Sequence, residues 1–220
     1  MSNSANGTST VTKRYPKGLR IPAILVSYIF HPVFMPTVMC LVLYRLMPST
    51  FAGIQPKEFT FVVIRFFITT AFFPILITLL CKALGFVESI HLETTKDRII
   101  PMLGTMICYF WMNLVVKNLG YPELLHTLSL GSFWAVIAAF MANIFVKISL
   151  HAVAAGGMLG ILLVVLFVSP VNLVLPFFLG LLVAGVIGSA RLILQAHRGA
   201  DIWLGYFVGI LSMVAAYWYL

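Results

Sequence analysis

The chain has 220 residues, of which 61% are hydrophobic and only 9% charged, and its formal net charge is +8. Soluble domains carry about 25% charged residues, so this composition and a mean hydropathy of +1.06 exclude an ordinary soluble protein. We therefore expect a multi-pass integral protein, placed in the bacterial inner (plasma) membrane, whose partner is the lipid bilayer rather than a nucleic acid.

The first 20 residues differ in character from the rest of the chain. They are rich in Ser, Thr, Asn and Gly and then become basic, which predicts a disordered basic tail over residues 1–20. No short apolar core followed by a small-residue cleavage site is present at this end, so we expect no cleaved signal peptide. The membrane domain is then expected to occupy residues 21–220.

Seven hydrophobic runs follow in chain order. They occupy residues 21–46, 59–84, 99–117, 127–147, 150–169, 171–192 and 201–220. Backbone groups cannot stay unpaired in lipid, so each run is predicted to be a helix, with Pro32 and Pro36 kinking the first. The predicted fold is all-α, a polytopic transmembrane helix bundle of about six to seven spans. The short link near residue 120 leaves open whether residues 99–147 form two full spans or a shallower helical pair.

Several residues that often carry chemistry are interpreted as structural. The three cysteines, Cys40, Cys81 and Cys108, lie within hydrophobic runs, and an odd number without paired spacing predicts neither a disulfide framework nor a metal cluster. His31 and His126 have no polar partner near them in the sequence, so we expect both to be packed or interfacial.

Three polar segments, residues 91–101, 147–151 and 189–201, are separated by even numbers of predicted spans. All three are therefore expected on the same membrane face, whichever face that is. Ionisable groups at span ends are costly to bury and often mark a site. The simpler interpretation is that the basic residues only anchor helices at the interface. Anchoring does not explain His151 and His197, each of which lies at the start of a span.

The third segment has the spacing of a nucleophilic site. His197 and Asp201 are four residues apart and share a helix face, so the carboxylate can hold the Nδ1–H of the imidazole and leave Nε2 free. The guanidinium of Arg191 suits phosphate oxygens, and His151 can protonate a leaving alkoxide. Together these groups predict phosphoryl transfer without a metal or another cofactor.

At these residues the chain resembles the type 2 phosphatidic acid phosphatase superfamily. The spacing Arg191-x5-His197-x3-Asp201 fits the family's third signature, Ser-Arg-x5-His-x3-Asp, without a gap, although Ala190 stands in place of the signature's serine. The stretch "ISLH" resembles the second signature, Pro-Ser-Gly-His, and keeps Ser149 and His151. The resemblance covers about the C-terminal 130 residues.

The first signature of that family, Lys-x6-Arg-Pro, is present only in a degenerate form, "KDRIIP". Arg98 fits its arginine, but Pro101 follows three residues later instead of immediately. His91 stands at the place of the lysine, so Lys96 or Lys147 is the expected substitute.

The resemblance implies a role for each residue. His197 would be the nucleophile that forms a phosphohistidine, Asp201 its orienting carboxylate and His151 the acid for the leaving group. The implied phosphate-binding residues are Arg191, Arg98, Lys96, Ser149 and Lys147.

Three functions are compatible with these residues. The first is a metal-independent lipid phosphatase that hydrolyses a phosphomonoester or diphosphate on polyprenyl diphosphate, phosphatidic acid or phosphatidylglycerol phosphate. The second is a lipid phosphotransferase or head-group transferase on the same scaffold. The third is a non-catalytic anion-binding or transport protein. The eroded first motif favours the third function, and the intact Arg-His-Asp triplet argues against it.

Overall fold

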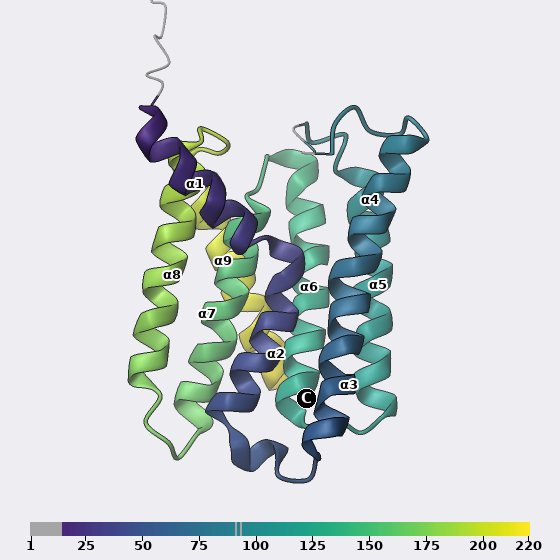
Figure 1. Cartoon of the computed structure of the whole chain (residues 1–220), viewed down its shortest axis with the longest axis vertical. Helices are drawn as coiled ribbons and strands as arrows, with labels where there is room; N and C mark the ends of the chain where they lie inside the picture. The colour runs from purple at the N-terminus through teal and green to yellow at the C-terminus, as the bar shows by residue number, and fades with distance from the viewer. Residues whose placement is uncertain (1–14, 91, 93) are drawn as a thin grey trace, which may run out of the picture.

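The computed structural model describes residues 15–90, 92 and 94–220. These residues form helices and no strands, and seven helical segments are long and apolar enough to cross a membrane (Figure 1). The predicted all-α transmembrane bundle is thus confirmed. Of the predicted tail, residues 1–14 lie outside the described residues, as does His91, and helix already begins at Lys17, before the expected boundary at residue 21.

Within the described part of the chain, nine α-helices make up the seven segments, because two of the segments are interrupted. They are α1 (Lys17–Ile29), α2 (Met35–Leu46), α3 (Pro56–Phe67), α4 (Phe73–Ala83), α5 (Ile99–Asn118), α6 (Glu123–Phe145), α7 (Leu150–Val168), α8 (Val174–Ile193) and α9 (Gly199–Tyr219). The first segment combines α1 and α2, and the second combines α3 and α4. The stretch left open by the sequence forms two full helices, α5 and α6.

The expected kink in the first segment is a complete break. Helix α1 ends at Ile29, a single 3₁₀ turn spans Pro32–Phe34, and α2 starts at Met35. Proline lacks the N–H that a helix interior needs and forces the preceding residue into an extended conformation, here His31 at φ −66° and ψ 135°. Pro36 lies in the first turn of α2, where proline is tolerated. As a result α1 leans across the bundle at an angle to α2 (Figure 1).

A π-helical turn, Ile68–Phe72, separates α3 from α4 and also has a proline as its cause. Pro74 has no N–H to offer the carbonyl of Thr70. The Tyr109 hydroxyl of α5 donates to that carbonyl at 3.4 Å instead. This contact joins the interrupted second segment to α5 near the middle of both.

Helix α7 is the most deeply buried of the spanning segments and packs closely against α9. Glycine makes this approach possible, because a Cβ on Gly209 would lie 2.1 Å from the Val153 carbonyl oxygen and 2.4 Å from the Gly157 nitrogen. At the upper end of the pair, the Ser149 backbone N–H donates to the Asp201 carbonyl at 3.3 Å. The glycine contact therefore holds the first turns of α7 against the middle of α9, and the bond from Ser149 to Asp201 joins the two helix starts.

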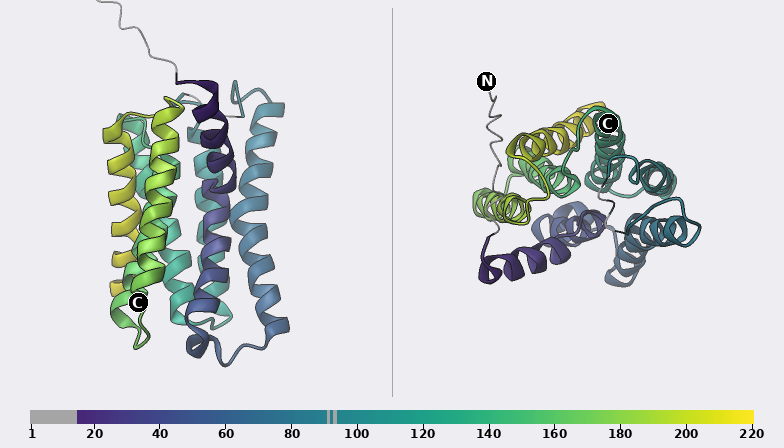
Figure 2. Two further views of the ribbon diagram at one scale, coloured as in Figure 1. Left: turned by 60° about the vertical axis from the view of Figure 1, so that its left-hand side comes forward. Right: turned by 90° about the horizontal axis from the view of Figure 1, so that it is seen from above.

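The three polar segments gather at one end of the bundle, as the span parity predicts. The loops before α5, before α7 and before α9 lie together at the end where α1 begins (Figure 1). The C-terminus lies near the opposite end (Figure 2). The bundle thus brings residues from distant parts of the chain to one membrane face.

The α7–α9 contact generates a prediction about stability. Gly209→Ala should lower the melting temperature in detergent, because the added Cβ meets backbone atoms that cannot turn aside, and overpacking costs roughly 1–3 kcal/mol. Gly185→Ala on α8 is the matched control, since its Cβ meets nothing within 4 Å. Equal melting temperatures for the two variants would show that the helices do not approach as described.

Candidate functional site

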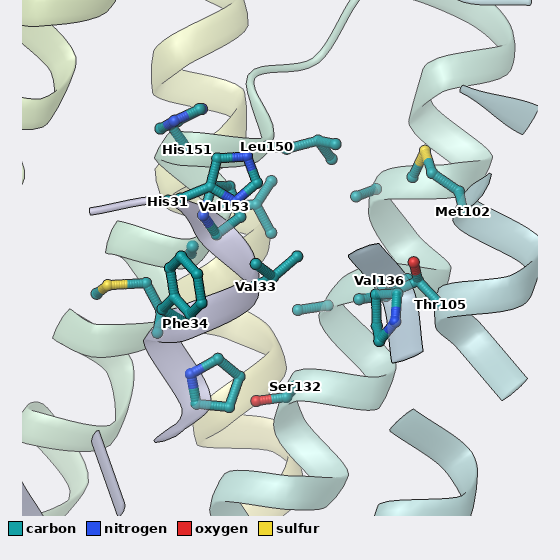
Figure 3. Close-up of a pocket in the computed structure, with 18 of the residues that line it drawn as sticks. His31, Val33, Phe34, Met102, Thr105, Ser132, Val136, Leu150, His151 and Val153 are labelled. Atoms are coloured by element: carbon teal, nitrogen blue, oxygen red, sulfur yellow. The ribbon is translucent and has the colours of Figure 1, made fainter. Parts of the chain in front are cut away.

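A cavity of about 770 Å³ lies between α1, α4, α5, α6, α7 and α8 (Figure 3). Four of the predicted site residues line it, namely Arg98, His151, Arg191 and His197. They come from three loops or helix ends that the sequence separates widely. The rest of the lining is largely apolar and includes Ile24, Leu79, Met102, Leu128, Ala135 and Met158.

The ring of His197 is fixed by a backbone carbonyl. Its Nδ1 lies 3.1 Å from the carbonyl oxygen of Lys147, in the loop before α7. A carbonyl only accepts hydrogen bonds, so Nδ1 carries the proton and Nε2 keeps its lone pair. His197 is buried, and its free Nε2 is the nitrogen that a nucleophile or base requires.

The position of Asp201 differs from the expected one. Its Oδ2 is 4.0 Å from His197 Nδ1, too far for a hydrogen bond, and accepts instead from the backbone N–H of Arg198 at 2.9 Å. The first backbone N–H groups of a helix have no partner within the helix, and the Asp201 carboxylate accepts from one of them instead of from His197. The Lys147 carbonyl therefore orients the imidazole, while Asp201 caps α9 and places a negative charge nearby.

Burial lowers the pKa of His197 to about 4, and the positive charges of Arg191 and Arg98 act in the same direction. Both effects disfavour the imidazolium, so the pKa moves down from its ordinary value. At neutral pH the ring is therefore neutral, with a lone pair available on Nε2.

Two guanidinium groups flank the cavity. Arg98 donates from Nε to the Leu92 carbonyl and from one terminal nitrogen to the Ile148 carbonyl, both at 2.9 Å. Arg191 donates to the Ser27 hydroxyl at 3.3 Å, and its buried Nε has no partner among the described residues. Within the same residues neither arginine forms an ion pair with a carboxylate. Two cations at the cavity wall, Arg98 buried and Arg191 half-buried, without an ion-paired carboxylate among the described residues favour an anionic ligand.

The two arginines also affect each other, and Arg98, which lies just before α5, shows this in its pKa. Burial lowers the pKa of Arg98, and the charge of Arg191 lowers it further. A phosphate group bound between the two guanidiniums would relieve this repulsion.

Three other predicted residues do not line the cavity. Lys96 is exposed, and Lys147 contributes its backbone carbonyl to the site. Ser149 is fully buried as the N-cap of α7, where its hydroxyl accepts from the Ala152 N–H at 3.4 Å. Ser149 illustrates why the sequence alone does not separate a cap from a ligand-binding residue, because helix capping uses the same residue types.

Residues of α1 and the break after it complete the site, and sequence reasoning missed them. The Ser27 carbonyl accepts from Nε2 of His151 at 3.0 Å, and His31 lines the cavity beside His151 (Figure 3). The expectation that His31 is a packed or interfacial residue is therefore incomplete. The one available signal was the "HP" pair that interrupts an apolar run.

Compared with known protein families, with curated proteins and with solved structures, the chain has no match.

Within the described residues, no group of three or more His, Cys, Asp or Glu side chains could hold a metal ion. The polar groups on the cavity wall include a neutral imidazole with a free Nε2, two further imidazoles and two guanidiniums that form no ion pair among the described residues. This set is suited to binding and attacking a phosphoryl group.

The electrostatics of His197 can be tested by histidine-selective NMR titration. We expect a pKa of about 4 and the Nδ1–H tautomer at neutral pH. Arg191→Gln should raise that pKa, because it removes a positive charge that disfavours the imidazolium. Arg198→Gln is the control, since Arg198 is exposed and outside the cavity. A wild-type value at the ordinary pKa of 6.5 would contradict the buried, cation-flanked site.

Proposed function

We propose that this chain is an integral-membrane lipid phosphatase that hydrolyses a phosphomonoester or diphosphate on a membrane lipid through a phosphohistidine on His197. The observation that carries the proposal is the fixed tautomer of His197, whose Nε2 is free beside two guanidiniums that form no ion pair among the described residues. The resemblance of its motifs to the type 2 phosphatidic acid phosphatase superfamily supports the same reading.

The shape of the cavity supports a lipid substrate. Its cationic residues lie near the loop end, and the remaining wall is largely apolar. Four exposed apolar side chains of α1, α4 and the loop that follows also line it, which places part of the cavity at the lipid-facing surface of the bundle. These residues are Ile24, Tyr28, Leu79 and Ile90. An amphiphile with an anionic head and an apolar tail matches both parts.

The proposed reaction has two steps. The Nε2 lone pair of His197 attacks phosphorus, the bond from phosphorus to the lipid oxygen breaks, and that oxygen takes a proton from His151. Water then attacks the phosphohistidine, His151 takes a proton from the water, and the P–N bond breaks to release inorganic phosphate. The negative charge of the bound substrate favours the protonated form of His151 in the first step.

The hydrogen bonds of His151 define which of its nitrogens acts. Its Nε2–H is committed to the Ser27 carbonyl, so Nδ1 is the nitrogen that gains and releases the proton. Arg98 and Arg191 bind the phosphoryl oxygens and stabilise the negative charge that develops on them.

Phosphate release from a panel of lipid phosphates in excess EDTA tests the proposal. Wild-type protein should release phosphate from at least one member, and His197→Asn should abolish release, because no nucleophile remains. Arg198→Gln, outside the cavity, should stay active. Lipid phosphate binding without any release would contradict a phosphatase and support an anion-binding protein. Complete loss in EDTA, restored by magnesium, would contradict a metal-free histidine mechanism.

His151→Ala should separate leaving-group protonation from phosphate binding. A general acid contributes roughly 10²–10⁴-fold, so kcat on a lipid monophosphate should fall by about that factor. The loss should be smaller on a diphosphate, whose phosphate leaving group needs less protonation. Equal losses on the two substrates would mean that His151 does not act as the acid.

A further inference from the structure

His31 is the one histidine of the cavity that neither the motifs nor the proposed mechanism uses. It lies in extended conformation between the end of α1 and the 3₁₀ turn that Pro32 begins. The break leaves its side chain on the cavity wall, next to the first turn of α7 (Figure 3).

His31 contacts the proposed acid directly. The rings of His31 and His151 meet edge to face, with centroids 5.5 Å apart and planes 80° apart. The same stretch of chain supplies the Ser27 carbonyl that accepts from His151 and the Ser27 hydroxyl that accepts from Arg191. The first segment therefore contacts two of the groups that would surround a bound phosphate.

The Nδ1 atom of His31 is buried and has no hydrogen-bond partner among the described residues. Leaving a buried polar nitrogen unpaired costs free energy, and native proteins rarely accept that cost without a reason. The charged and titratable groups nearest to the ring are Arg191 and His151. Arg191 and the protonated Nδ1 of His151 are donors toward an anion, so an oxygen of a bound anion is the partner that fits all three side chains.

We propose that His31 is a third histidine of the site and donates a hydrogen bond from Nδ1 to an oxygen of the phosphate group of the lipid substrate. This inference rests on the proposed function, because it takes a phosphate group as the ligand of the cavity. Its role is binding, and the bond-making steps stay with His197 and His151. The loss of His31 should therefore act mainly on KM and on the affinity for phosphate analogues.

Binding of orthovanadate to the full chain in detergent, followed by calorimetry, tests this role. His31→Phe keeps an aromatic ring but removes the donor, and should weaken vanadate binding by roughly tenfold, the loss expected for a hydrogen bond to a charged group. His31→Asn offers an amide N–H near the position of Nδ1 and should restore most of the affinity. His126→Phe, at the opposite end of α6 and outside the cavity, should bind vanadate as the wild type does.

Two outcomes would overturn the inference. One is wild-type affinity in His31→Phe. The other is an equal loss of affinity and of melting temperature in His31→Phe and His31→Asn, which would indicate a purely structural role. If the wild type releases phosphate but its vanadate affinity does not depend on His31, only this inference fails. If affinity depends on His31 but no lipid phosphate is hydrolysed, the proposed phosphatase fails and the anion contact stands.

A measurement on the wild-type chain tests the role of His31 even if the His31 variants are less stable than the wild type. In histidine-selective ¹⁵N spectra, vanadate should shift the signals of His31, His151 and His197, the histidines that line the cavity among the described residues. A His31 signal, assigned by its loss in His31→Phe, that does not respond to vanadate would exclude His31 from the anion site.

Discussion

The hydrogen bond from His197 Nδ1 to the Lys147 carbonyl joins two loops and decides which imidazole nitrogen is free. It forms only because the starts of α7 and α9 lie together, which their glycine contact and the bond from Ser149 to Asp201 ensure. Without that approach the ring could adopt either tautomer, and Nε2 would have no fixed direction. The packing of two spans in the centre of the bundle is thus directly linked to the chemistry of one nitrogen.

Burial keeps the imidazole of His197 neutral, so its Nε2 retains a lone pair. Desolvation and the charges of Arg191 and Arg98 lower the pKa of His197. The same two arginines, which form no ion pair among the described residues, favour the binding of an anion. In water these effects would be screened, but at the end of a membrane bundle they act across a small, partly apolar cavity. Asp201 caps α9 without forming an ion pair with either arginine, and its charge still acts on Arg98.

The fold was largely predictable, because hydrophobic runs of this length in lipid must be helices, and span parity alone places three polar segments on one face. Arg191 and His197, which the sequence spacing assigns to one site, both line the cavity. It did not predict that a backbone carbonyl of residue 147 would replace Asp201 as the partner of His197, because carbonyls leave no trace in a sequence. His31 was missed because its place depends on how α1 folds back after Pro32, which is a tertiary property.

The central claim, attack on phosphorus by Nε2 of His197, is tested most directly by trapping the intermediate. Full-length protein is mixed with a ³²P-labelled lipid phosphate, quenched within milliseconds in alkali, and analysed for label bound to protein. Labelled protein should be stable in alkali and labile in acid, as a phosphohistidine is, and the label should map to His197 and be absent from His197→Asn. Turnover without any labelled protein at any time point, or label that persists in His197→Asn, would contradict it.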